Sequence, residues 1–298
     1  MAAANRFTKK KTILYRFSEK HKEYIRRCKE CSYNVAEGAV RAGKTVDNVF
    51  AFAHELKTTP DKIHLATGST MANAKMNIGD CNGMGLEWIF RGQSHWGKYK
   101  DNEALFIKGP ATHNKQKIVI FAGGAKEDSY KKIRGNSYGM WIATEINLHH
   151  DNTIKEAFNR QLAAKHLKVF WDLNPDNPRA AIYSEYIDRY QRQQEEGNFP
   201  GGYNYMHCTI YDNINITSER LKEIESRYDV NSIWYMRDIK GMRVVANGLI
   251  FRRFADDIST KKFGFALKEK PKDIMEINLG IDFGGSGSGH SFTATAIT

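Results

Sequence analysis

The sequence predicts an α/β protein with a mostly parallel central sheet flanked by helices. Short β-type runs alternate with longer stretches in which apolar residues recur at helical spacing, which is typical of strand–helix–strand units. A glycine-rich octapeptide, GAVRAGKT at 38–45, lies between a predicted strand and a predicted helix. The chain has 298 residues, of which 41% are hydrophobic, so it is long enough to bury a sizeable core.

The expected elements follow in order along the chain. Strands are predicted at 32–38, 62–68, 117–124, 139–145 and 167–174. Helices are predicted after Lys44 and over 153–165, the latter with Asp151 or Thr153 as its N-cap. From 181 to 240 the chain becomes polar and helical around one more strand candidate within 203–213. We interpret this region as a subdomain attached to the sheet.

Composition limits the function classes. The formal net charge is +11, from 45 Lys and Arg against 34 Asp and Glu. This excess favours a polyanionic partner, nucleic acid first, although phosphate-rich ligands or solubility would also account for it. The longest apolar runs are far shorter than the roughly 20 residues of a membrane span. We expect no membrane partner and no secretory signal, and therefore a cytoplasmic protein.

The four cysteines do not indicate a disulfide scaffold in a chain of this length. Cys28 and Cys31 form an isolated C-x-x-C, and no second pair lies at the spacing of a zinc ribbon. We interpret them as two ordinary thiols one helical turn apart.

The octapeptide has the spacing of a phosphate-binding loop, with Gly38, Gly43, Lys44 and Thr45 at the required positions. Glycines allow successive backbone N–H groups to converge on phosphate oxygens, and the helix that follows points its positive end at the anion. Lys44 would reach the β and γ phosphates, and Thr45 would place its hydroxyl on Mg²⁺. The expected nucleotide contacts are Gly38, Ala39, Val40, Arg41, Ala42, Gly43, Lys44 and Thr45. The alternative is a plain glycine turn.

Two further residues have the chemistry that hydrolysis requires. Glu145 ends the predicted strand 139–145, where a carboxylate at the carboxyl edge of a parallel sheet faces the phosphates. The usual pattern has Asp before this Glu, whereas this chain has Thr144. This threonine would either contact the groups that are bound to magnesium or indicate weakened metal binding. Arg134, in a glycine-flanked loop, is a candidate arginine finger, although a solvated loop residue is the alternative.

Several motifs in fixed order resemble one family. FSEKHKEYI, VAEGAVRAGKT, IRGNSYGMWIATE, WDLNPDNP, CTIYDNINITSERLKEI and GMRVVANGLIF together cover about 13–252. They look like the ATPase half of the large terminase subunit of tailed bacteriophages, specifically the PBSX-like group. The resemblance implies a P-loop NTPase of the RecA/ASCE type, which hydrolyses ATP with Mg²⁺ and drives double-stranded DNA into a preformed capsid.

The resemblance also implies roles for single residues. Arg41 would be the arginine that the family places inside the Walker A loop, and Glu145 the catalytic glutamate. Asn174 and Pro175 fall at the family's coupling motif, which senses the γ-phosphate. Arg134 sits where a finger acting on a neighbouring subunit is expected.

At the N-terminus, Tyr15 and Phe17 lie near the segment that packs against adenine in this family. The family often has Gln where this chain has His21, so the residues that recognise adenine are open.

The resemblance implies four parts in the chain: an ATPase core in 1–180, a lid or linker subdomain in 181–252, an interdomain linker in 253–275 and the beginning of an RNase H-like nuclease domain in 276–298. Asp282 would be its first carboxylate for Mg²⁺ or Mn²⁺. Such a site needs carboxylates from later strands, so we expect no nuclease activity from this chain.

The expected partners are nonspecifically bound double-stranded DNA, the portal protein, the small terminase subunit and further copies of the chain in a ring on the portal. The site of action would be the host cytoplasm and not the mature virion. Two alternatives remain open: a helicase-type nucleic-acid ATPase, which would need a second tandem sheet, and an assembly protein with an idle ATPase that binds DNA or portal.

Overall fold

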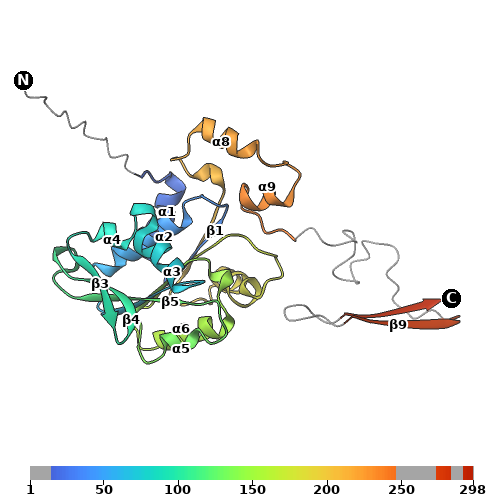
Figure 1. Cartoon of the computed structure of the whole chain (residues 1–298), viewed down its shortest axis with the longest axis horizontal. Coiled ribbons are helices and arrows are strands. Elements are labelled where there is room, and N and C mark those ends of the chain that lie inside the picture. The colour runs from blue at the N-terminus through green and yellow to red at the C-terminus, as the bar shows by residue number, and fades with distance from the viewer. Residues whose placement is uncertain (1–14, 246–272, 283–290, 298) are drawn as a thin grey trace, which may run out of the picture. The chain divides into compact units, whose positions relative to one another are not determined.

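The computed structural model describes residues 15–245, 273–282 and 291–297 (Figure 1). The chain divides into two compact units, residues 1–247 and 248–298. In the second unit, the described residues form an antiparallel hairpin of β9 (Glu276–Asp282) and β10 (Ser291–Ile297). The predicted linker, apart from 273–275, lies outside the described residues.

The first unit is built on an eight-stranded sheet with the strand order β3-β4-β5-β2-β6-β7-β1-β8. From β5 to β8 all neighbours are parallel, and β3 and β4 add an antiparallel hairpin beside β5. The bounds are β1 Tyr33–Gly38, β2 Ile63–Gly68, β3 Ser94–Tyr99, β4 Asn102–Ile107, β5 Lys117–Gly123, β6 Met140–Ala143, β7 Lys168–Leu173 and β8 Tyr203–Cys208.

Helices cover both faces of this sheet (Figure 1). Successive side chains of a strand point to opposite faces, so Phe170 of β7 packs with Phe52 of α2, whereas Trp171 packs with Phe158 of α6. The α-helices are α1 Glu19–Cys28, α2 Lys44–Leu56, α3 Met71–Ala74, α4 Leu86–Ile89, α5 Tyr130–Ile133, α6 Asp151–Gln161, α7 Asp188–Glu195, α8 Ser218–Glu225 and α9 Ile233–Asp238. Two π-helical turns, η1 (Lys75–Asp80) and η5 (Tyr183–Ile187), and four short 3-10 turns, η2 (Cys81–Gly83), η3 (Pro110–Thr112), η4 (Ile146–Leu148) and η6 (Ile210–Asp212), complete the unit.

The five strands predicted in the core are confirmed, and two predictions need correction. Strand β8 pairs in parallel with β1, so the sheet of the core extends past the predicted boundary at residue 180. Helix α6 begins at Asp151, because the side chain of His150 accepts the N–H of Asn152 and forms the N-cap in place of Asp151 or Thr153. The β3–β4 hairpin is an addition that the sequence pattern did not indicate.

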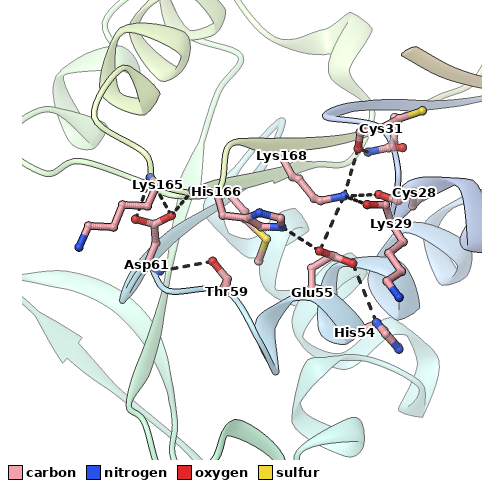
Figure 2. A network of polar contacts seen from close by, with 12 residues as sticks. Cys28, Lys29, Cys31, His54, Glu55, Thr59, Asp61, Lys165, His166 and Lys168 are labelled. Atoms are coloured by element: carbon pink, nitrogen blue, oxygen red, sulfur yellow. Dashed lines mark hydrogen bonds and ion pairs between the residues drawn. The ribbon is translucent and has the colours of Figure 1, made fainter. Parts of the chain in front are cut away.

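A buried polar network holds the amino-terminal ends of the strands (Figure 2). The ammonium group of Lys168, at the start of β7, donates to the main-chain oxygens of Cys28, Lys29 (2.7 Å) and Cys31 (3.2 Å), where helix α1 ends. Glu55 of α2 lies 3.7 Å from the same ammonium and accepts a hydrogen bond from His166 at 2.9 Å. One buried lysine therefore joins α1 and α2 to the sheet.

The helices of the described ranges are all too short or too polar to cross a membrane. All four cysteines are free thiols, and burial raises the pKa of both Cys28 and Cys31. In the same ranges no group of three or more His, Cys, Asp and Glu side chains could hold a metal ion. These observations agree with structural roles for Cys28 and Cys31.

Candidate nucleotide-binding site

The predicted phosphate loop connects the carboxyl end of β1 to the first turn of α2. Gly38 is required by close approach, since a Cβ atom there would lie 2.0 Å from the carbonyl oxygen of Cys208. Gly43 has a φ of 103°, and a Cβ there would meet the Tyr15 hydroxyl at 2.6 Å. Arg41 is left-handed with a φ of 61°, although it is not glycine. The loop thus has the positive-φ backbone that is typical of anion-binding loops.

Lys44 is buried beneath this loop. Its ammonium group donates to the carbonyl oxygens of Gly38 (2.9 Å) and Ala39 (2.6 Å) and to the side-chain oxygen of Asn174 (3.1 Å). Burial lowers the pKa of Lys44, and the carboxyl of Asp172 opposes this effect. Two residues predicted separately, Lys44 and Asn174, are therefore in direct contact.

Asp172 is a buried carboxylate in this site that the sequence analysis did not single out. One of its oxygens accepts the hydroxyl of Thr144 and the main-chain N–H of Glu145, both at 3.2 Å. Thr45 is near enough to favour the ionised carboxyl and so to lower the pKa of Asp172 against the effect of burial. Asp172 and Asn174 are two residues apart at the end of one strand, so they face the same side. That period of two was the available signal.

Glu145 is held in a strained backbone conformation, with a φ of 52° and a ψ of 52°. Its N–H is fixed by Asp172, and its carbonyl oxygen accepts hydrogen bonds from Leu148 N (2.9 Å) and His149 Nδ1 (3.3 Å). Burial lowers the pKa of His149 to about 4, so its ring is neutral near pH 7. Non-glycine residues in this region are uncommon and occur often at functional sites.

The two predicted arginines lie in different places. Arg41 and its neighbour Val40 are exposed on the phosphate loop, and the Arg41 carbonyl accepts a hydrogen bond from Asn213 at 2.7 Å. Arg134 follows α5, is 57% exposed, stacks 4.5 Å over the ring of Tyr130 and pairs with Glu156 of α6 at 3.3 Å. Arg134 thus lies in the α5–α6 layer and is not brought to the phosphate loop of its own chain.

The two predicted aromatic residues lie beside the loop. The Tyr15 and Phe17 rings make an edge contact with their centroids 5.1 Å apart, and the centroids of Phe17 and Phe50 of α2 lie 5.0 Å apart. Next to them, buried His21 hydrogen-bonds to Asp47 of α2 through Nδ1, while its Nε2 has no partner among the described residues. A Cβ atom on Gly43 would lie 3.2 Å from the His21 ring, so this histidine lies against the phosphate loop.

A second set of contacts that the sequence did not indicate joins the loop to the lid region. Arg243 forms a two-pronged pair with buried Glu37, with Nε–Oε1 and Nη2–Oε2 distances of 2.9 and 2.7 Å, and also binds Asp188 at 2.7 Å. A Cβ atom on Gly241 would lie 2.7 Å from the N atom of Ala39. The segment that leaves the lid therefore packs directly on the loop.

A cavity of about 310 Å³ separates the predicted coupling motif from the lid. Pro175 and Asn177 line one side, and Trp234 and Arg237 of α9 line the other. Asn174 directly precedes Pro175, so the predicted coupling motif and the predicted lid face each other across this cavity.

The residues present fit a nucleoside triphosphate with Mg²⁺. The left-handed loop, the amino end of α2 and Lys44 provide donors for phosphates, and Thr45, Asp172 and Glu145 provide the oxygen ligands or acceptors that Mg²⁺ and its waters prefer.

Solved structures with the same fold are known. The large terminase from a thermophilic bacteriophage has a TM-score of 0.65 at 19% identity, over 95% of this chain and 66% of that chain. The same protein in complex with ADP has a TM-score of 0.65 at 19% identity, over 95% of this chain and 65% of that chain. The large terminase ATPase domain of a Thermus phage has a TM-score of 0.51 at 14% identity, over 72% of this chain and 89% of that chain.

At these identities the likeness shows the fold, and it confirms the predicted α/β class for the ATPase part. The chain spans about two thirds of the length of the thermophilic bacteriophage terminase, 66% in one crystal form. No protein-family model and no curated protein sequence matches this chain.

Proposed function

We propose that this chain is the ATPase part of a motor that packages double-stranded viral DNA. The observation that carries the proposal is the meeting of Lys44, Thr45, Asn174 and Glu145 at one edge of a sheet. It is supported by the likeness in fold to large terminases, one of which has been solved with ADP and with ATP-γ-S.

In the proposed reaction, loop N–H groups and the amino end of α2 bind the β and γ phosphates of ATP. Lys44 would turn from the loop carbonyls to the phosphate oxygens, and Thr45 would hold Mg²⁺, which neutralises phosphate charge when bound. Glu145 would orient the attacking water. Because chemistry of this kind depends on positioning and charge, the strained but fixed backbone of Glu145 supports this role.

Asn174 would report the γ-phosphate to the lid. Its side-chain oxygen accepts the Lys44 ammonium, so movement of Lys44 toward phosphate frees it. The next residue, Pro175, lines the cavity that faces α9. Loss of the γ-phosphate would thus change contacts across this cavity and move the lid, which would advance the DNA.

Arg134 would complete the site of a neighbouring copy in a ring on the portal protein, with the small terminase subunit delivering DNA. Its exposed position away from its own phosphate loop supports action on a neighbour. Mixing Arg134→Ala with Glu145→Gln subunits should then restore part of the activity that each lacks alone.

DNA binding would be nonspecific, through basic side chains that contact phosphates, in agreement with the net charge of +11. Affinity should fall steeply with salt. The role of Asp282 as the first carboxylate of a nuclease site that binds Mg²⁺ or Mn²⁺ remains a proposal; the structure places its backbone at the end of β9.

Phosphate release tests the proposal most directly. We expect Lys44→Ala and Glu145→Gln to abolish ATP hydrolysis measured with and without DNA, while Glu87→Gln, exposed on α4, serves as the matched control and hydrolyses like wild type. Equal rates in all four proteins would contradict the proposal and favour an assembly protein whose ATPase is idle.

A further inference from the structure

The position that usually carries the acidic magnesium residue is Thr144 in this chain. Thr144 is buried at the end of β6, and its hydroxyl donates to Asp172 of the neighbouring strand β7 at 3.2 Å. A hydroxyl there cannot supply negative charge to a metal ion. Asp172, whose carboxylate accepts this hydroxyl, can supply it.

Asp172 collects contacts from three elements that meet at the phosphate loop. It accepts the Thr144 hydroxyl, which follows β6, and the N–H of Glu145, and it lies near Thr45 in the first turn of α2. Lys44 is close enough for its charge to favour the ionised carboxyl. Asp172 therefore contacts the main chain of Glu145 and lies near Thr45, the residue that would hold Mg²⁺.

The other buried carboxylates around the loop are already committed. Glu37 is bound by Arg243, Tyr183 and Tyr205, and Asp47 is bound by His21. The hydrogen-bond donors to Asp172, by contrast, are one hydroxyl group and one N–H, both uncharged.

We propose that Asp172 is the residue that positions Mg²⁺ with the bound nucleotide, in place of an acid at position 144. Its charge, held beside Thr45 and Glu145, would attract Mg²⁺ and the waters bound to it. Burial raises the pKa of Asp172, and a bound cation would offset this cost. This inference rests on the proposed function.

The test is the gain in nucleotide affinity that Mg²⁺ brings, measured by calorimetric titration of ATP-γ-S in Mg²⁺ and in EDTA. In Asp172→Asn the gain should fall by about 10- to 100-fold, as for other groups that orient metal ligands, while affinity in EDTA stays close to wild type. In Thr144→Val the gain should fall much less, because only one of the hydrogen bonds to Asp172 is lost. Adding Thr144→Asp to Asp172→Asn should restore most of the gain.

The outcomes separate this inference from the proposed function. If wild type binds no nucleotide, the proposed function fails. If wild type binds and hydrolyses ATP but Asp172→Asn keeps the full Mg²⁺ gain, or if Thr144→Val loses it instead, the inference alone is overturned. Should Asp172→Asn not fold, Thr144→Val still decides, because it leaves Asp172 in place: loss of the Mg²⁺ gain in that variant overturns the inference, and a gain close to wild type supports it.

Discussion

Two buried lysines at opposite edges of the same sheet differ in what they bind. Lys168 at the amino edge donates to three carbonyl oxygens at the end of α1 and lies 3.7 Å from Glu55, which itself binds His166 (Figure 2). Lys44 at the carboxyl edge donates to two carbonyls of its own loop and to Asn174. Burial lowers the pKa of both.

The difference separates a structural lysine from the lysine that we propose binds phosphate. The partners of Lys168 are a carboxylate and backbone oxygens that lie far from it in the sequence. Its hydrogen bonds therefore fasten separate elements to one another, and no ligand is needed to satisfy it. The partners of Lys44 are neutral, and an anion that enters the loop would offer it a stronger bond. Burial alone would have given the two lysines the same interpretation.

The largest effect should come from breaking the functional lysine. Lys44→Ala should lower ATP hydrolysis about 100- to 1,000-fold, because one donor to the developing phosphate charge is lost. Its thermal unfolding temperature should stay close to that of wild type, because the desolvation cost of the buried ammonium and its attraction to the Asp172 carboxyl are lost together. Lost hydrolysis together with a clear loss of stability would mean that Lys44 is structural too.

Breaking the structural lysine should have the converse result. Lys168→Met should lower the free energy of unfolding by about 3 kcal/mol, because Glu55 and three buried carbonyls lose a charged partner. Lys155→Met is the matched control, since Lys155 is 63% exposed beside Asp151, and should leave stability close to that of wild type.

Urea unfolding measures both variants. Those Lys168→Met molecules that stay folded should bind nucleotide as wild type does. A loss of affinity without a loss of stability would place Lys168 in the site.

The sequence predicted the position of Lys44 in a phosphate loop, but it did not predict which residues from other strands surround that loop. The motif at 38–45 is local, so Lys44 and Thr45 could be located without the fold. The importance of Asp172 depends on β7 lying between β6 and β1, and nothing near Asp172 in the chain states that order. Strand β8 was separated from the core for the same reason, because its partner β1 lies 170 residues earlier, as in the pair Tyr33 and Tyr203.

The next prediction tests whether an ion pair fastens the phosphate loop to the predicted lid, as Lys168 fastens α1 and α2 to the sheet. Arg243 pairs with Glu37, which directly precedes Gly38, and its guanidinium lies 3.7 Å over the ring of Tyr183. Arg243→Lys keeps the charge but loses the two-pronged geometry, so stability should fall by about 2 kcal/mol. Arg237→Lys, on the same lid and 36% exposed, should change it by under about 1 kcal/mol. Equal effects in the two variants would contradict a specific tie between loop and lid.

The smallest effect concerns a buried histidine at the amino edge. His64 accepts the N–H of Met140 at Nδ1 (3.2 Å) and contacts the carbonyl of Asp61 through Nε2 (3.1 Å), so neither nitrogen has room for another proton. Burial, aided by the charge of Lys117, lowers the pKa of His64 from 6.5 to about 3. Below pH 6.5 the unfolded chain therefore binds a proton that the folded chain does not, and the stability of wild type falls with acidity. The variant His64→Gln lacks this group, so the stability difference between wild type and variant should narrow by about 1.4 kcal/mol for each pH unit below 6.5. Urea unfolding of both proteins from pH 7.5 to 5.5 measures this change, about 1.4 kcal/mol in all. A difference that stays constant would mean that His64 takes up its proton as readily in the folded chain as in the unfolded one.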